Sequence, residues 1–141
     1  MNRDSDIAKR LLEVIPKCMR IIRRELRQFA KPSLTVPQFR VLANIFQGTQ
    51  LTSELAELHG ISLPAMSTLV DGLVRRGFVT RRPGTNDRRH VVLKLSRKGS
   101  SAYAQVRKNL EVKLAVLIAS FNDEQKSTLL EGLSLLETIF H

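Results

Sequence analysis

Apolar residues near the N-terminus recur every three or four positions, a spacing that predicts a long amphipathic helix. The members of this stripe are Ile7, Leu11, Ile15, Cys18, Ile22, Leu26 and Phe29. Ser5 or Asp6 is suited to cap the helix at its start. Pro16 lacks a backbone N–H, so we expect it to kink or restart the helix.

Three shorter helices with the same spacing are predicted next, and the second and third are joined by a tight turn. In the first of these three helices, Pro37 suits the position where the helix begins. Thr52 or Ser53 can cap the second of them. Gly60 is placed to turn the chain, and Ser62 can cap the third. The outward polar residues of the third helix are Ser67, Thr68 and Asp71. A short glycine turn between two helices is the arrangement that presents a recognition helix to the major groove of DNA.

A β-hairpin is predicted after these helices. Residues 78–82 and 90–95 alternate apolar and polar positions, and residues 83–87 between them are typical of a turn. Arg88 and Arg89 lie where such a hairpin projects. Arginine at a loop tip suits the narrow minor groove of DNA, where the negative potential is strongest.

The last third of the chain returns to helical spacing. Its first apolar stripe comprises Tyr103, Val106, Leu110, Leu114, Leu117 and Phe121. Asn122 and Gln125 then form the pattern of a capping box. A final helix carries Leu129, Leu133, Leu136 and Phe140. Together with the first helix, these stripes are more apolar than a small DNA-binding module needs, so we expect a helical dimer interface.

The distribution of charge narrows the class of partner. The 141 residues carry a formal net charge of +10, and residues 75–98 contain nine Lys or Arg residues and one acid, Asp87. A cationic segment of this density favours a polyanionic partner, double-stranded DNA first of all. Charge alone also suits an architectural protein that compacts DNA with little sequence preference, and that alternative stays open.

Other compositional features exclude several classes of protein. The single cysteine excludes an internal disulfide framework and suits a reducing cytoplasm. The chain has neither a long apolar run nor a signal-peptide pattern, so we expect one cytoplasmic domain over residues 1–141 and no membrane partner. His59, His90 and His141 lack the spacing of metal ligands. Phosphate-binding loops and hydrolase motifs are missing, so neither an enzyme nor a cofactor is expected.

Cys18 has two interpretations. It lies on the apolar stripe of the first helix, which favours a small buried hydrophobic side chain. Lys17 and Arg20 are close in sequence and would support a thiolate, and hence a sensor of oxidants. No second cysteine is present to resolve an oxidised thiol. The sequence therefore favours the buried side chain over the sensor.

Five short motifs follow one another along the chain: LTVPQF (34–39), ELA (54–56), STLVDGLVRRG (67–77), DRR (87–89) and LSRKG (95–99). They resemble those of MarR-type winged helix-turn-helix regulators. Each motif is weak alone, but their order and spacing are specific, and the flanking helices also fit. The resemblance implies a mainly α fold with a small β-hairpin wing.

The resemblance also implies an assembly and a role. The N- and C-terminal helices of two copies would interlock in a homodimer. Residues 1–31 and 99–141 would form the dimerisation region, and residues 34–98 the winged helix-turn-helix. Such a dimer binds a pseudo-palindromic operator and usually represses nearby genes. Small aromatic acids, other lipophilic compounds or thiol oxidation often relieve that repression.

By the same resemblance, particular residues would meet DNA. Those at the start of the recognition helix are Ser62, Pro64, Ala65, Ser67 and Thr68. Arg88 and Arg89 would form the wing tip, with Arg89 in the minor groove. Asp87 would hold the wing by pairing with an arginine such as Arg75.

Simpler interpretations of these residues stay open. Asp71 is either a surface acid or a group that orients an arginine toward DNA. Ser62 is in any case suited to cap its helix. The remaining polar side chains, including those of the wing tip, also suit a solvated surface.

A possible effector site also follows from the resemblance, because effectors of this family lodge between the dimerisation helices and the winged region. The residues that would line this cleft are Met19, Arg23, Phe39, Leu42 and Phe46. An arginine beside phenylalanines suits an aromatic carboxylate. The same residues also suit an ordinary core, and the sequence leaves both readings open.

Overall fold

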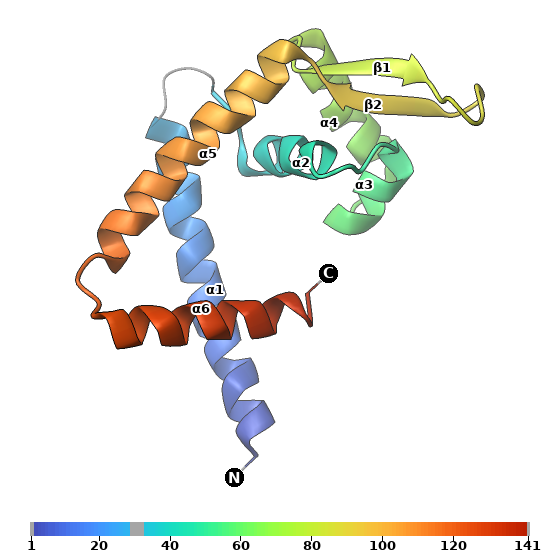
Figure 1. Cartoon of the computed structure of the whole chain (residues 1–141). Coiled ribbons are helices and arrows are strands. Elements are labelled where there is room, and N and C mark those ends of the chain that lie inside the picture. Colours follow the sequence, from blue (N-terminus) through green and yellow to red (C-terminus); the bar gives the residue numbers. More distant parts are fainter. Residues whose placement is uncertain (1, 29–32, 141) are drawn as a thin grey trace. The chain divides into compact units, whose positions relative to one another are not determined.

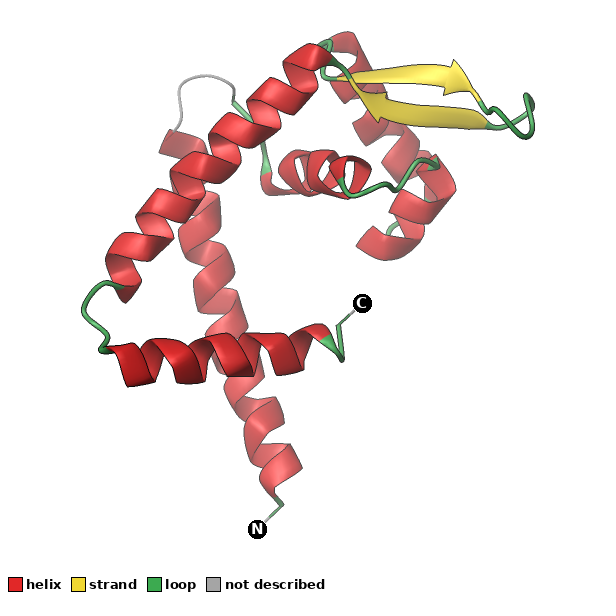
Figure 2. Cartoon of the chain, viewed as in Figure 1, coloured by secondary structure: helices red, strands yellow, loops and turns green. Residues whose placement is uncertain are grey.

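A computed structural model describes residues 2–28 and 33–140, and within these it contains six helices and one two-stranded hairpin (Figure 1). The elements are α1 (Arg3–Gln28), α2 (Val36–Phe46), α3 (Thr52–His59), α4 (Leu63–Arg75), β1 (Val79–Pro83), β2 (Val91–Leu95), α5 (Arg97–Ile118) and α6 (Asp123–Glu137). Helices predominate and the hairpin is small (Figure 2), so the predicted fold class is confirmed. The chain divides into two compact units, Met1–Arg107 and Lys108–His141.

Several helix starts follow from local capping; the sequence predicts the caps at Ser62 and Asn122 but not the one at Thr35. Thr35 and Gln38 cap α2 reciprocally: Gln38 N donates to Thr35 Oγ1 at 3.2 Å, and Thr35 N donates to Gln38 Oε1 at 3.0 Å. Ser62 caps α4 by accepting from Ala65 N at 3.2 Å. Asn122 begins α6 with a second capping box. These bonds satisfy backbone N–H groups that a helix leaves free at its N-terminus.

Other predicted helix starts are wrong. Leu51 is the N-cap of α3 and makes no side-chain cap bond, so neither Thr52 nor Ser53 caps that helix. Helix α1 begins at Arg3, before the predicted caps. It also continues through Pro16 without a restart. A proline at that position removes a single hydrogen bond from a helix of 26 residues, and the rest of the helix supports the turn.

The core of the first unit lies where the helix pair meets the hairpin. Fully buried side chains from α2, α3, α4 and β2 include Leu42, Leu55, Met66, Val70, Leu73 and Leu93, and Val79 of β1 and Val106 of α5 are fully buried as well. The strands pair antiparallel, with Val79 opposite Leu95. Leu93 N also donates to Gln50 O at 2.8 Å, which ties β2 to the loop before α3. The hairpin therefore rests on the same core that holds α4.

Helices α1, α5 and α6 each leave several large apolar side chains exposed in the single chain. Helix α6 has no buried residue, and Leu130 is 66% exposed. On α1, Leu12 is 77% exposed, and on α5, Val116 is 68% exposed. Phe29, the last member of the predicted N-terminal stripe, lies outside the described residues. Among the described helices, none is long and apolar enough to cross a membrane.

Candidate nucleic-acid interface

The start of α4 presents an exposed polar surface. Pro64, Ala65 and Thr68 are exposed, and Ser67 is half-buried. The Thr68 hydroxyl donates to Pro64 O at 3.1 Å, so its proton is held within the helix while its oxygen still has acceptor capacity. The Ser62 hydroxyl is occupied as the helix cap. The predicted contact residues therefore share one accessible helix end, with Thr68 available chiefly as an acceptor.

An ion pair joins this helix to the hairpin. Asp71 of α4 pairs with the Arg81 guanidinium of β1, and both side chains are about half exposed. The pair shows that Asp71 holds an arginine in place, and whether that arginine is oriented toward DNA stays a prediction. Arg81 was absent from the predicted site, because its partner lies ten residues earlier and on another element. Arg75, on the same helix, is exposed and has no ion pair within residues 2–28 and 33–140.

The wing tip is organised by Asp87 and Arg89. Asp87 Oδ1 accepts from Arg89 N at 3.0 Å and from Arg89 Nε at 3.2 Å, and Oδ2 accepts from Arg89 Nη2 at 3.2 Å. These side-chain and backbone hydrogen bonds from Arg89 lower the pKa of Asp87, so the carboxylate stays charged. The prediction that Asp87 pairs with Arg75 is wrong, because Asp87 pairs with Arg89, two residues away.

The geometry of the tip leaves its arginines accessible. The side chain of Arg89 is 90% exposed despite its ion pair. Arg88 is exposed as well and has no ion pair in the part of the chain that the structure describes. The carboxylate therefore fixes the base of one arginine and leaves both cationic groups open to a polyanion.

The base of the wing is a tight junction around Phe78, which is buried. The Arg76 guanidinium carbon lies 4.7 Å from the centre of the Phe78 ring, and Lys98 Nζ lies 4.9 Å from it. Lys98 Nζ also donates to Arg76 O at 2.7 Å. Gly77 turns the chain between α4 and β1 with φ of 80°, a left-handed conformation that glycine adopts without strain. These contacts tie the end of α4 to the start of α5.

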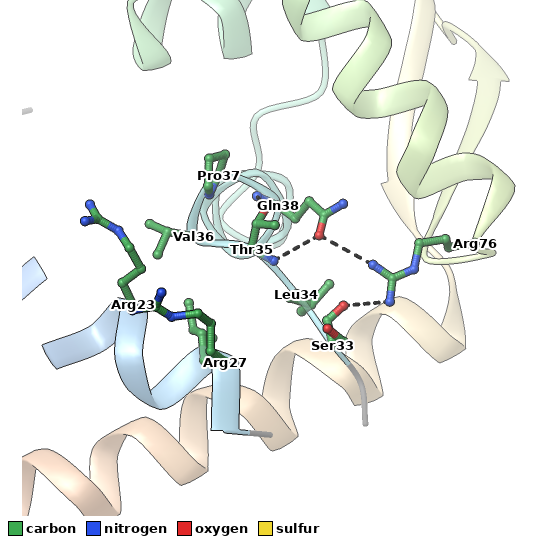
Figure 3. A pocket seen from close by; sticks show the side chains of 10 residues that line it. Arg23, Arg27, Ser33, Leu34, Thr35, Val36, Pro37, Gln38 and Arg76 are labelled. Carbon is green, nitrogen blue, oxygen red and sulfur yellow. Dashed lines mark hydrogen bonds between the residues drawn. The ribbon is translucent and has the colours of Figure 1, made fainter. Parts of the chain in front are cut away.

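A pocket of about 570 Å³ lies in the first unit, beside the end of α1 and the start of α2 (Figure 3). Its polar lining includes three arginines, Arg23, Arg27 and Arg76, and its apolar lining includes Leu26 and Leu34. Figure 3 shows Arg23 and Arg27 on α1, and Arg76 reaching toward Ser33 and Gln38 from the end of α4. No carboxylate of the described residues pairs with these three arginines.

Of the five residues predicted to line an effector cleft, Arg23 lines this pocket. Leu42 is fully buried core. The rings of Phe39 and Phe46 lie 5.5 Å and 5.0 Å from the ring of Tyr103, centre to centre. Met19 is half-buried and is not part of the lining. The role of these residues as effector ligands stays a prediction.

The Cys18 thiol does not lie where the sequence predicts it. Cys18 is exposed in the protomer, so the expectation of a buried side chain is wrong there. On the same apolar stripe Ile7 and Ile15 are exposed as well, whereas Leu26 is buried. Within the described ranges there is no cluster of three or more His, Cys, Asp or Glu residues that could hold a metal ion.

Comparison with known sequences shows what the chain resembles. The sequence model of the MarR family matches residues 34–91. The chain is 31% identical over 113 residues to the uncharacterised HTH-type transcriptional regulator YfiV of Bacillus subtilis, covering 79% of this chain and 71% of that protein. It is 29% identical over 101 residues to the HTH-type transcriptional repressor YetL of the same species, covering 70% of this chain and 60% of YetL.

Comparison with solved structures supports the fold. FabT of Streptococcus pneumoniae, solved in complex with DNA, superposes with a TM-score of 0.75. The match covers 96% of this chain and 95% of FabT at 19% sequence identity. At that identity the likeness is evidence for the fold alone.

Proposed function

The chain belongs to the MarR family of DNA-binding transcription regulators, and from this premise we propose that it is a sequence-specific repressor that binds a pseudo-palindromic operator as a homodimer. Because the family consists of regulators, the expectation that the chain is not an enzyme is confirmed. The repressive role is supported by the name of YetL and by the usual role of the family. A cytoplasmic location is part of the same proposal.

The observation that carries the proposal is the Asp71–Arg81 ion pair. It joins the exposed face of α4 to β1, so that recognition helix and wing form one surface. On this surface Ser67 and Thr68 would meet base edges or phosphates in the major groove. Arg89 would enter the adjacent minor groove, and Arg75 and Arg88 would meet phosphates. Because the helix and the wing are fixed to each other, they suit binding at a specific DNA sequence better than binding without sequence preference.

Exposed apolar side chains support the homodimer. Helices α1, α5 and α6 each leave several of them uncovered in the protomer, and α6 buries none. At about 25 cal/mol per Å² of apolar surface, covering such faces stabilises an assembly strongly. We propose that residues 1–31 and 99–141 of a second copy cover them. Residues 34–98 would then form one DNA-binding region in each subunit.

The experiment that tests the function uses sheared genomic DNA of the source organism. The purified protein is incubated with it at about 150 mM salt, and bound fragments are recovered and sequenced. Recovery of a few promoter-proximal fragments that share an inverted repeat is the expected result. Broad, flat recovery would instead favour the architectural alternative, for which the net charge of +10 is sufficient.

The last part of the proposal is that a small molecule releases the protein from its operator. The pocket at Arg23 combines cationic and apolar lining, which suits a small organic acid. The alternative trigger is oxidation of the Cys18 thiol, which is exposed in the single chain. Thermal unfolding and operator binding, each with and without salicylate or peroxide, separate the two. A Cys18→Ser variant that responds like the wild type would exclude the thiol.

A further inference from the structure

The recognition helix α4 lacks the side chains that proteins commonly use to read guanine and adenine. Between Ser62 and Val74 the sequence contains no arginine, lysine, asparagine, glutamine, glutamate or histidine. Arginine or lysine reads guanine through O6 and N7, and asparagine or glutamine reads adenine through N6 and N7. None of these contacts can come from the first turns of α4, the part of a recognition helix that meets base edges.

The exposed face of this part of α4 is instead small and largely apolar. Pro64, Ala65 and Thr68 are exposed, and because Thr68 follows the other two by four and three residues, all three share one face of the helix. The Thr68 hydroxyl donates to Pro64 O at 3.1 Å, which holds the side chain in one rotamer and fixes the direction of its methyl group. Thr68 and Ala65 therefore offer methyl groups to a partner.

The polar side chains of the same helix do not favour guanine. Ser67 is half-buried, and a serine hydroxyl can contact any base because it both donates and accepts. Asp71 is the only charged residue between Ser62 and Val74, and its carboxylate is an acceptor, as are N7 and O6 of guanine. The Arg81 guanidinium, which has the donors to read guanine, is paired with Asp71.

A glycine in the middle of α4 indicates that a partner approaches this face closely. Gly72 follows Thr68 by four residues and so lies on the same face. Apart from the residues on either side and the backbone of its own helix, no heavy atom of the described chain lies within 4 Å of a Cβ added there. Packing within the described chain gives no reason for a glycine, which destabilises a helix relative to alanine. A helix backbone that lies close to base edges would give that reason.

We propose that α4 recognises thymine in the major groove through its C5-methyl group, with Thr68 as the contact residue and Ala65 beside it. In the major groove thymine alone among the four bases presents a methyl group, and apolar contacts from alanine and threonine methyl groups suit it. Thymines rather than guanines therefore define the operator positions that face the start of α4. This inference rests on the proposed function and names the base that the same surface reads.

Replacement of thymine by deoxyuridine tests the contact, because it removes the methyl group and leaves the hydrogen-bonding edges and the minor groove unchanged. The probe is the inverted repeat recovered from genomic DNA, with each thymine replaced in turn at the equivalent positions of both half-sites. Operator affinity is measured by fluorescence anisotropy. At one thymine position or more, we expect a loss of about 15-fold, which is about 4-fold for each of the two buried methyl groups.

Replacement of guanine by 7-deazaguanine, which lacks the N7 acceptor, is the complementary measurement. Because α4 has no donor pair for guanine, we expect each such replacement in the half-sites to change affinity by less than about 2-fold.

Two variants of Thr68 assign the contact to this residue. Thr68→Ser removes the methyl group and keeps the hydroxyl, whereas Thr68→Val removes the hydroxyl and keeps a methyl group. On the unmodified operator, Thr68→Ser should bind about 15-fold more weakly, since both subunits of the dimer lose one methyl contact. It should then lose little more when the critical thymine becomes deoxyuridine, because the two changes remove the same contact. Thr68→Val should remain as sensitive to deoxyuridine as the wild type.

Thr128→Ser is the matched control for Thr68→Ser. The Thr128 hydroxyl donates to Glu124 O at 3.0 Å, the same bond to the carbonyl four residues earlier, but Thr128 lies on α6, outside the region proposed to bind DNA. This variant should lose as much affinity with deoxyuridine as the wild type does.

Gly72→Ala tests the close approach of the helix to DNA. It adds one methyl group to the same face without a clash inside the described chain, so the variant should fold. We expect it to bind the operator about 5-fold or more weakly, as overpacking of a filled contact does. Unchanged affinity would contradict the close approach.

Three results would overturn the thymine contact itself. They are an operator in which no deoxyuridine lowers affinity, an equal loss with deoxyuridine in wild type and Thr68→Ser, and a loss of about 10-fold or more with 7-deazaguanine. The last would show that guanine is read, by Arg75 or Arg81. In all three cases an operator is still preferred, so the proposed function stands. If no DNA sequence is preferred, the proposed function fails, and the thymine contact fails with it.

Discussion

Replacement of Gly99 by alanine should destabilise the junction between the wing and α5. An ideal Cβ at position 99 would lie 1.9 Å from Phe78 O and 2.8 Å from Phe78 C, whereas real Cβ atoms essentially never approach within 3.0 Å. The obstacle is backbone, which cannot rotate away as a flexible side chain can. The start of α5 and the start of β1 would therefore have to separate.

The size of the effect follows from the bonds that cross this junction. Ser96 N donates to Phe78 O at 3.0 Å, and Ser96 Oγ donates to Gly77 O at 2.5 Å. Losing both costs about 2 kcal/mol, and the overpacking itself costs about 2 kcal/mol. Alanine regains up to about 1 kcal/mol through its higher helix propensity. The net loss is about 3 kcal/mol, or roughly 10 °C in the unfolding midpoint for a chain of this size.

Gly72→Ala is the matched control, because it makes the same change inside a helix without a clash. Apart from the residues on either side and the backbone of its own helix, no heavy atom of the described chain lies within 4 Å of an added Cβ there. We expect this variant to be stabilised by up to about 1 kcal/mol. Thermal and urea unfolding, followed by circular dichroism, measure both variants. Equal midpoints for Gly99→Ala and Gly72→Ala would refute the close packing of the junction.

Three further predictions concern the wing, a histidine and a helix cap. Arg89→Ala should weaken operator binding by about 1–3 kcal/mol without moving the unfolding midpoint, because the side chain is 90% exposed; unchanged affinity would show that the tip is misassigned. His59 donates to Asn44 Oδ1 at 2.8 Å, and burial first and Arg40 second lower its pKa below the ordinary 6.5. As pH falls, His59 therefore takes up its proton in the unfolded state first, and the free energy of unfolding should decrease below about pH 6.5. In urea titrations at several pH values, His59→Gln should not show this part of the decrease. Asn122→Ala should cost about 1 kcal/mol by removing the cap of α6, whereas Asn122→Asp should retain it, as unfolding midpoints will show.

Features that depend on neighbouring residues could be predicted from the sequence. The caps at Thr35, Ser62 and Asn122 involve residues three positions apart, so the motif contains both partners. Gly60 ends α3 in a left-handed conformation because a residue without Cβ adopts it without strain. The strands begin and end within one residue of their predicted bounds at most ends, since alternation and turn chemistry are equally local.

Pairings between elements could not be predicted in the same way. Asp71 had several arginines within reach of a folded chain, and the hairpin geometry selects Arg81. Asp87 was paired with a distant arginine in our prediction, although Arg89 is close enough to form both backbone and side-chain bonds. Arg76 donates hydrogen bonds to Ser33 and Gln38, about forty residues earlier. No local pattern marks such contacts, because they depend on how the helices pack.

The apolar stripes show a different limit of sequence interpretation. Spacing every three or four residues identifies the face of a helix that is to be covered, but it does not identify what covers it. Cys18 lies on such a stripe and is nevertheless exposed, as are Ile7 on the same stripe and Leu133 on the stripe of α6. The rule fails at these positions only if the protomer is taken as the complete folded unit. If a second copy covers these apolar faces, the exposed positions follow the rule. The exposed stripes therefore support the proposed homodimer. On that view Cys18 lies at or near the dimer interface, and its accessibility to oxidants depends on whether the protein is assembled.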